Sequence, residues 1–186
     1  KSRKISIEHT CLMLLTSGSL GSPSCVKYTF KNLLASFISM NQFVNHTVYD
    51  RWIATLPFYH IGGFSIITRA LISGSSIIIP SSAAYSELKK DIVNFNPTLV
   101  SLVPTQLEKL ISSGIRPWRS LRHIFLGGGP ASENLIEKAV KDLWPVLLVY
   151  GSTETSSMVS YCTTQNLIKN GMSLGVPFNS VNISID

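Results

Sequence analysis

Charged side chains are scarce in this sequence, and long apolar runs are absent. Only 14% of the 186 residues are Asp, Glu, Lys or Arg, against about 25% in an ordinary soluble domain. The mean hydropathy is only +0.25, and no apolar run reaches the roughly 18 residues that a membrane-spanning helix needs. A hydrophobic content of 45% excludes disorder, because disordered segments are poor in apolar residues. We therefore expect a soluble globular domain with an apolar surplus and no membrane span.

Paired cysteines are also lacking. Cys11, Cys25 and Cys162 are far apart and form no Cys-x-x-Cys pair, which favours a reducing, cytoplasmic setting. The net charge is +6, from 16 basic and 10 acidic residues. These bases are scattered and do not cluster with aromatic residues, so nucleic-acid binding is not indicated. Attraction for a small anion is the simpler interpretation.

Both ends of the sequence look interrupted. The first residue is Lys1 rather than a methionine, and no apolar signal core follows it. Residues 181–186 alternate apolar and polar side chains as a strand does, with no turn after them. We expect this chain to be a piece of a longer protein, with apolar faces exposed where the rest would pack.

Predicted strands and helices alternate along most of the chain. An apolar run at 9–16 predicts a buried strand, a small-residue loop at 16–24 follows it, and Thr29 is a candidate N-cap for a helix to about Val44. Further strands are expected near 51–56, 75–79, 98–103, 123–126 and 146–150, and further helices near 63–72, 86–95, 105–111 and 132–143. This alternation predicts an α/β fold with a mostly parallel sheet flanked by helices.

Three segments of small residues are expected at the carboxyl ends of strands, where open α/β sheets bind ligands. They are the hydroxyl-rich loop 16–24, the glycines Gly127–Gly129, and the sequence Tyr-Gly-Ser-Thr-Glu-Thr at 150–155. Glycines and hydroxyls allow the backbone to approach a phosphate and to donate hydrogen bonds to it. Each segment alone is also compatible with an ordinary turn, and the first lacks the Walker A pattern. Together they are expected to converge on one crevice.

Two titratable residues accompany these loops. Glu154 is the only acid between Asp142 and Asp186. One carboxylate beside hydroxyls suits Mg²⁺, which takes further ligands from water and substrate phosphates; the alternative is a glutamate that caps a helix turn. His60 lies between two aromatic residues and a Gly-Gly pair, so it is a candidate gate to a pocket, the alternative being a structural histidine.

The order and spacing of five motifs resemble the adenylate-forming superfamily of acyl-CoA synthetases over nearly the whole chain. The motifs are Thr16-Ser17-Gly18-Ser19-Leu20-Gly21-Ser22-Pro23, Pro57-Phe58-Tyr59-His60-Ile61-Gly62-Gly63, Gly127-Gly128-Gly129-Pro130, Tyr150-Gly151-Ser152-Thr153-Glu154-Thr155 and Gly175-Val176-Pro177. Within the superfamily, the middle three look most like the o-succinylbenzoate–CoA ligases of menaquinone biosynthesis. The resemblance implies part of the large N-terminal domain of an enzyme that uses MgATP to convert a carboxylate to an acyl-adenylate and then forms the coenzyme A thioester.

The resemblance also implies roles for individual residues. The implied nucleotide-binding residues are Thr16, Ser17, Gly18, Ser19, Gly21, Gly128, Gly129, Tyr150, Gly151, Ser152 and Thr153. The implied catalytic residues are His60, Thr153 and Glu154, of which Glu154 is the magnesium ligand. In this scheme the first set of loop residues holds the β- and γ-phosphates, Tyr150 stacks on adenine, and the two glycines line the adenine and acyl sites. Residues 1–50 would form the phosphate-loop segment and residues 51–186 a βαβ-type subdomain with the adenine and acyl loops.

The phosphate loop departs from the family pattern. The family continues with Pro-Lys-Gly where this chain has Pro23-Ser24-Cys25, and it has threonine at the position of Leu20. In an extended segment Lys27 would point away from the face of Ser24, so it does not replace the missing lysine. Loss of one charge-assisted phosphate contact would cost about 1.5–3 kcal/mol. We expect weakened ATP binding.

Further parts of the family pattern would fall beyond Asp186. These are the ribose-binding aspartate, the hinge and the C-terminal lid domain with its catalytic lysine, so the chain alone is expected to be inactive. Two alternatives stay open. The parent could be a CoA ligase for fatty or aryl acids, or a non-catalytic relative that binds a nucleotide or an acyl group.

Overall fold

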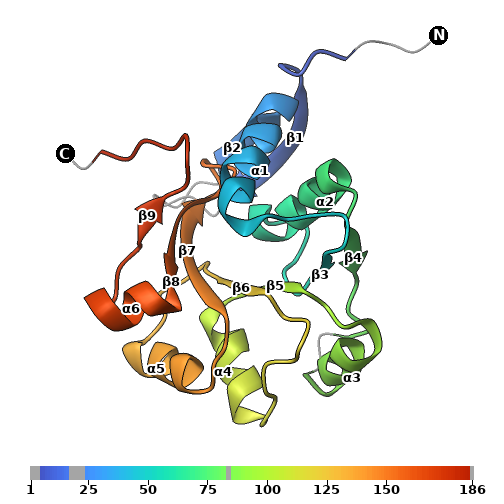
Figure 1. Cartoon of the computed structure of the whole chain (residues 1–186). Coiled ribbons are helices and arrows are strands. Elements are labelled where there is room, and N and C mark those ends of the chain that lie inside the picture. The colour runs from blue at the N-terminus through green and yellow to red at the C-terminus, as the bar shows by residue number, and fades with distance from the viewer. Residues whose placement is uncertain (1–4, 17–23, 83–84, 185–186) are drawn as a thin grey trace.

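A seven-stranded sheet lies between two layers of helices in the computed structural model, which describes residues 5–16, 24–82 and 85–184 (Figure 1). The strands are β1 (Thr10–Thr16), β2 (Ser24–Thr29), β3 (Arg51–Ile53), β4 (Ser76–Ile78), β5 (Leu99–Leu102), β6 (His123–Leu126), β7 (Val146–Ser152), β8 (Ser157–Thr163) and β9 (Val176–Pro177). The helices are α1 (Phe30–Val44), α2 (Ile61–Ser73), α3 (Tyr85–Phe95), α4 (Pro104–Ser112), α5 (Glu133–Lys141) and α6 (Thr164–Asn170). None of the described helices is long and apolar enough to cross a membrane.

The strand order in the large sheet is β4-β3-β5-β6-β7-β8-β9. The first five of these strands are parallel, while β8 and β9 pair antiparallel at one edge. The predicted α/β fold with a mostly parallel sheet is therefore confirmed. The sequence did not predict β8, α6 or β9, because their mixed Ser, Thr and Tyr residues show neither a long apolar run nor a clear period.

Alternate residues of each strand face opposite helix layers. In β3, Trp52 packs toward α1 and α2 with Ile66, whereas Ile53 packs toward α3, α4 and α5 with Leu107. This alternation is the ordinary geometry of a strand buried on both faces. Both faces are therefore apolar, as the hydrophobic surplus predicts for a parallel sheet.

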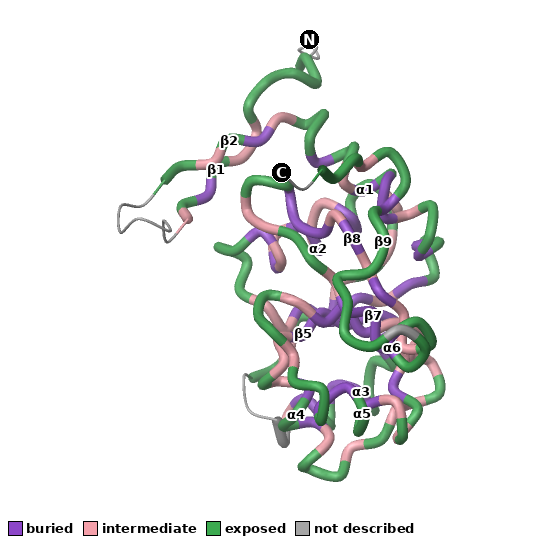
Figure 2. Tube along the Cα trace, turned by 90° about the vertical axis from the view of Figure 1, so that its left-hand side faces the viewer, coloured by how far each residue is buried: buried purple, intermediate pink, exposed green. Residues whose placement is uncertain are grey.

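The strands β1 and β2 form a separate antiparallel hairpin that projects from the main body (Figure 2). Its inner face, with Leu14 and Tyr28, packs on Leu33 of α1 and Ile61 of α2. The strand predicted at 9–16 is present as β1, but its predicted burial is wrong, because the side chains of Met13 and Leu15 on the outer face are 59% and 69% exposed. A two-stranded sheet packed on one side buries only alternate residues.

The sequence predicted the start of α1 correctly and the C-terminal segment incorrectly. Thr29 caps α1 as expected: its hydroxyl accepts a hydrogen bond from the Asn32 backbone N–H at 3.2 Å, and the Asn32 side chain accepts one from the Thr29 N–H at 2.9 Å. The predicted C-terminal strand is wrong over 181–184, and residues 185–186 lie outside the described ranges. There the Val181 N–H donates to the Phe178 carbonyl, and the resulting turn ends the extended segment.

Candidate active site

A cavity of about 440 Å³ opens at the carboxyl ends of β5, β6 and β7. Its walls come from the 56–63 segment at the start of α2, from the glycines after β6, and from Gly151–Thr153 at the end of β7. His60, Gly128, Ser152 and Thr153 therefore meet around one space, although they are far apart in the sequence. This position is where open α/β sheets bind ligands.

A second cavity of about 710 Å³ lies beside the first. Gly129 and Tyr150 line it, together with Met172–Leu174, and the two cavities share Gly128, Val149 and Gly151 as a common wall. Tyr150 is about half exposed, so its ring is accessible for stacking. Residues Met172–Leu174 were not predicted to be near the site, and they reach the cavity because α6 folds back along β8.

Gly151 is required by a close backbone approach within the β7–β8 turn. A Cβ at this position would lie 1.9 Å from the Ser157 carbonyl oxygen, which no side chain tolerates. The pairing of β7 with β8 shifts register between Tyr150 and Gly151. The Thr155 hydroxyl accepts a hydrogen bond from the Ser152 backbone N–H and donates one to the Ser157 carbonyl, both at 2.8 Å. The turn that carries the Ser-Thr-Glu motif is thus fixed by its own backbone.

Glu154 and Thr153 occupy the tip of this turn. Glu154 is exposed, and hydrogen bonds from its own backbone N–H and from the Ser152 hydroxyl lower the pKa of its carboxyl below the usual value. The Thr153 carbonyl accepts a hydrogen bond from the Tyr28 hydroxyl of β2. Burial, with a smaller contribution from the nearby Glu154 charge, raises the pKa of Tyr28 to about 12. Tyr28 was not a predicted site residue, because no sequence pattern indicated strand β2.

His60 stands at the N-terminus of α2 and borders the first cavity. It is exposed, its side chain forms no capping hydrogen bond, and its ring lies 4.6 Å from that of Tyr59. These contacts fit a side chain at the mouth of a pocket better than a packed structural histidine.

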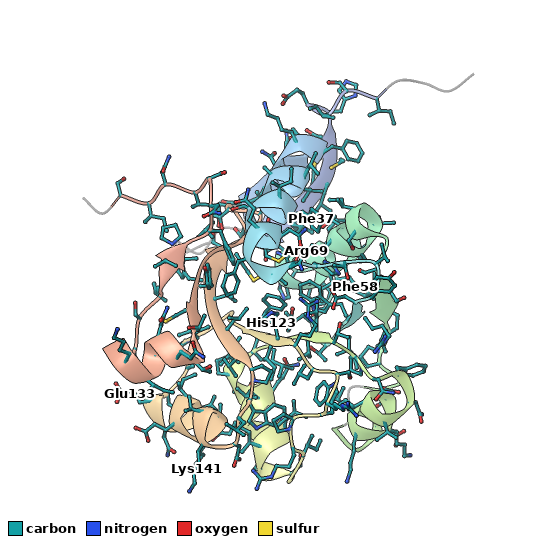
Figure 3. All side chains as sticks on the ribbon, in the orientation of Figure 1. Phe37, Phe58, Arg69, His123, Glu133 and Lys141 are labelled. Carbon is teal, nitrogen blue, oxygen red and sulfur yellow. The ribbon has the colours of Figure 1, made fainter. Side chains whose placement is uncertain are left out.

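Arg69 of α2 is the functional candidate that sequence analysis did not identify. Its side chain is labelled in Figure 3. It lines the first cavity but is only 2% exposed, and burial lowers its pKa to about 9. One guanidinium nitrogen donates to the Ser157 hydroxyl at 3.4 Å, and the guanidinium carbon lies 5.3 Å from the centre of the Trp52 ring. Within the described ranges Arg69 makes no ion pair. A buried cation without an anionic partner is costly unless a ligand supplies one.

The phosphate-loop residues Ser17, Gly18, Ser19 and Gly21 lie outside the described residues. Thr16, which precedes them, pairs with Ser24 at the loop end of the hairpin and lines neither cavity. Ser24 is on the same side of β2 as the buried Tyr28, whereas Lys27 is exposed on the opposite side. The strand thus turns Lys27 away from the site, in agreement with the expectation that it cannot replace the missing lysine.

A magnesium site made only of protein side chains is not present in the described part of the chain. No group of three or more His, Cys, Asp or Glu side chains there could hold a metal ion. The single ionised carboxylate of Glu154 still fits Mg²⁺ that receives most of its ligands from nucleotide phosphates and water.

Comparison with known proteins identifies relatives among the AMP-binding enzymes. A family model of AMP-binding enzymes matches residues 1–186. The 2-succinylbenzoate–CoA ligase of Bacillus velezensis is 31% identical over 182 residues, which are 98% of this chain and 37% of that protein. The corresponding ligase of Staphylococcus epidermidis is 33% identical over 182 residues, 98% of this chain and 38% of its own length. This chain thus spans a little over a third of the relatives it matches.

Solved structures agree with this comparison. The o-succinylbenzoate CoA synthetase of Bacillus subtilis in complex with the acyl-adenylate intermediate OSB-AMP superimposes with a TM-score of 0.93 at 32% identity, covering 97% of this chain and 37% of that one. The same enzyme in complex with ATP and magnesium ion gives the same TM-score and identity. The superposition covers nearly the whole of this chain. This chain belongs to the family of AMP-binding enzymes.

Proposed function

We propose that this chain forms the acyl- and nucleotide-binding part of an acid–CoA ligase that activates o-succinylbenzoate for menaquinone biosynthesis. In the proposed reaction a carboxylate oxygen attacks the α-phosphorus of ATP and pyrophosphate leaves; the coenzyme A thiol then displaces AMP to form the thioester. Family membership, the ligases at 31–33% identity and two adjoining cavities support this proposal.

The observation that carries the substrate assignment is Arg69. Because this buried guanidinium lines the first cavity without an anionic partner in the described chain, it favours a substrate that brings its own negative charge into the apolar interior. An aromatic dicarboxylate has such a charge: one carboxylate is activated, and the second remains to pair with Arg69. A fatty acid would leave the cation unpaired, at a cost of several kcal/mol.

The remaining roles follow from where the side chains lie. His60 at the mouth of the first cavity would border the reacting carboxylate, and Thr153 would donate its hydroxyl to the nucleotide phosphate. Tyr150 would stack on adenine in the second cavity, while Gly128, Gly129, Gly151 and Ser152 leave the backbone accessible beside it. Glu154 would hold Mg²⁺, which neutralises phosphate charge as it redistributes. Preorganised donors of this kind stabilise the transition state because they need not reorient.

Other parts of the proposal concern the whole protein. Residues 1–50 would contribute the phosphate loop, with Thr16, Ser17, Gly18, Ser19 and Gly21 at the β- and γ-phosphates, and residues 51–186 would contribute the adenine and acyl sites. A C-terminal domain of the same enzyme would supply the catalytic lysine and complete the coenzyme A site. The three cysteines are free thiols, which supports a cytoplasmic location.

Pyrophosphate exchange in the full-length protein tests this function. We expect ATP–pyrophosphate exchange that depends on o-succinylbenzoate and falls at least a hundredfold in an Arg69→Met variant, with a smaller effect on the KM for ATP. A panel of fatty and aryl acids serves as the specificity control. A fatty acid as the best substrate would contradict the substrate assignment. The absence of exchange with every acid would contradict the proposal that the protein is an enzyme.

One observation favours a second candidate. Ser24 stands where the family has lysine, so this chain could belong to a relative that binds a nucleotide or an acyl group without catalysis. Such a protein would bind AMP and ATP with similar affinity and would show no exchange, whereas the ligase would show both exchange and a preference for MgATP.

A further inference from the structure

Two neighbouring serines are held in an uncommon backbone conformation, and the second of them, Ser157, lines the first cavity. Ser156 has φ 58° and Ser157 has φ 91°, values that side-chain-bearing residues rarely adopt. Both residues are buried. Such a conformation persists only where surrounding contacts hold it in place, and it is often found at ligand sites.

Three side-chain hydrogen bonds hold this pair. The Ser36 hydroxyl of α1 donates to the Ser156 carbonyl at 2.8 Å. The Thr155 hydroxyl donates to the Ser157 carbonyl at 2.8 Å, and Arg69 donates to the Ser157 hydroxyl at 3.4 Å. Thr155 belongs to the same turn, so Ser36 supplies the hydrogen bond that ties this backbone to a neighbouring helix. Ser36 lines neither cavity.

The orientation of Arg69 depends on Ser157. The Trp52 ring supports the guanidinium 5.3 Å away but gives it no hydrogen bond. In the part of the chain that the structure describes, the Ser157 hydroxyl is the side-chain acceptor that Arg69 uses. A rotation of the Ser156–Ser157 backbone would move this hydroxyl and leave the guanidinium without a fixed direction.

We infer that Ser36 is a positioning residue for acid binding, a role that rests on the proposed function of Arg69. Its hydroxyl holds the Ser156 carbonyl and thereby fixes Ser157 in the left-handed conformation. Ser157 then aims the Arg69 guanidinium into the first cavity, where the second carboxylate of the acid would bind. A side chain on α1 thus sets the affinity for a ligand that it does not touch.

Substitution of Ser36 tests this inference against a matched control on the same helix. Ser39, one turn further along α1, is buried and donates its hydroxyl to the Asn179 carbonyl at 2.6 Å. Ser36→Ala and Ser39→Ala therefore remove the same atom and the same kind of bond. In the full-length protein we expect Ser36→Ala to raise the calorimetric Kd for o-succinylbenzoate about three- to tenfold, as loss of one hydrogen bond implies, and Ser39→Ala to leave it unchanged. Ser36→Thr, which keeps the hydroxyl, should restore the affinity.

Two further measurements separate positioning from general stability. In an Arg69→Met background, Ser36→Ala should cause no additional loss of affinity, because the two residues act through one interaction. In the absence of any ligand, the Nε–H resonance of Arg69 in the NMR spectrum should shift in Ser36→Ala and not in Ser39→Ala. The second readout needs no acid, so it tests the positioning of Arg69 even if o-succinylbenzoate is not the substrate.

The outcomes distinguish this inference from the function on which it rests. Equal Kd values and an unmoved Arg69 resonance in Ser36→Ala would overturn the positioning role and leave the proposed function intact. Additive losses in the double variant would also overturn it. If the wild-type chain does not bind o-succinylbenzoate, the proposed function fails and the inferred effect on acid affinity fails with it, whereas the NMR result still decides whether Ser36 orients Arg69.

Discussion

The bond between Tyr28 and Thr153 joins the phosphate-loop hairpin to the turn that carries the magnesium candidate. The Tyr28 ring is 1% exposed and packs with Leu14, Leu33 and Ile61, while its hydroxyl reaches the Thr153 carbonyl. A Tyr28→Phe substitution removes only the hydroxyl, so the ring still fills the same space. It therefore isolates the hydrogen bond from the packing of the hairpin.

The structure sets the size of the expected effect. One intramolecular hydrogen bond contributes about 0.5–1.5 kcal/mol, and more where a buried carbonyl is left unpaired. Thr153 is only half-buried, so water can reach its carbonyl and we expect a loss near 1 kcal/mol. For a chain of this length that corresponds to a fall in Tm of about 2–4 °C. The hairpin would also lose its hydrogen bond to the turn beside Glu154, and we expect ATP affinity to fall about fivefold, or roughly 1 kcal/mol.

Thermal unfolding and calorimetric ATP titration measure these two effects. Tyr49→Phe is the matched control, because Tyr49 undergoes the same chemical change at a position that is 83% exposed. A Tyr28→Phe variant with the Tm and ATP affinity of the control would refute the reasoning. A lowered Tm with unchanged ATP affinity would show that the bond stabilises the hairpin but does not position the nucleotide site.

Three further predictions concern other parts of the chain. Ser24→Lys should tighten ATP about tenfold or more and AMP much less, as a charge-assisted phosphate contact worth about 1.5–3 kcal/mol implies; equal effects on both nucleotides would argue against the β/γ-phosphate assignment. Gly63→Ala should destabilise the chain by about 1–3 kcal/mol in urea unfolding, because its Cβ would lie 2.2 Å from the Pro57 carbonyl, whereas Gly62→Ala meets only a side chain and should cost less. Burial lowers the pKa of His46 to about 4. As the pH falls below about 6.5, the imidazole of His46 therefore binds a proton in the unfolded chain but not yet in the folded chain. The free energy of unfolding should fall by about 2–3 kcal/mol between pH 6.5 and pH 4. His46→Gln should flatten that loss, and an unchanged pH profile would count against the shift.

The sequence predicted the parallel strands well because burial on both faces leaves a strong signal. His123–Leu126 has the predicted bounds, and the other predicted parallel strands differ from the observed ones only at their ends. The hairpin was predicted poorly for the converse reason. Ser24–Thr29 places Lys27 and Cys25 on an exposed face, so no apolar run marks it as a strand.

The sequence motifs predicted the loops of the candidate site, but they did not include its buried cation, Arg69. Arg69 is one cation among the apolar residues of α2, and in sequence it resembles an ordinary solvent-facing charge. A signal was present: Ile66 and Ala70, which lie on the same side of the helix, are both apolar and buried. An arginine on the buried side of a helix needs an anion or a ring to compensate it. Helical spacing of the neighbours could therefore have identified Arg69 as a ligand-binding candidate.

The contacts that assemble the site all end on one short segment. Tyr28 bonds to Thr153, Ser36 to Ser156, and Arg69 to Ser157, so the hairpin, α1 and α2 each fasten a different residue of the β7–β8 turn. Each contact joins residues separated by 88 or more positions in the chain, and no local pattern can reveal such a pair. The glycines and hydroxyls of the motif allow the turn to approach a nucleotide, but its shape is imposed by these three elements. Binding affinity should therefore respond to substitutions on α1 and β2 that leave every motif residue in place.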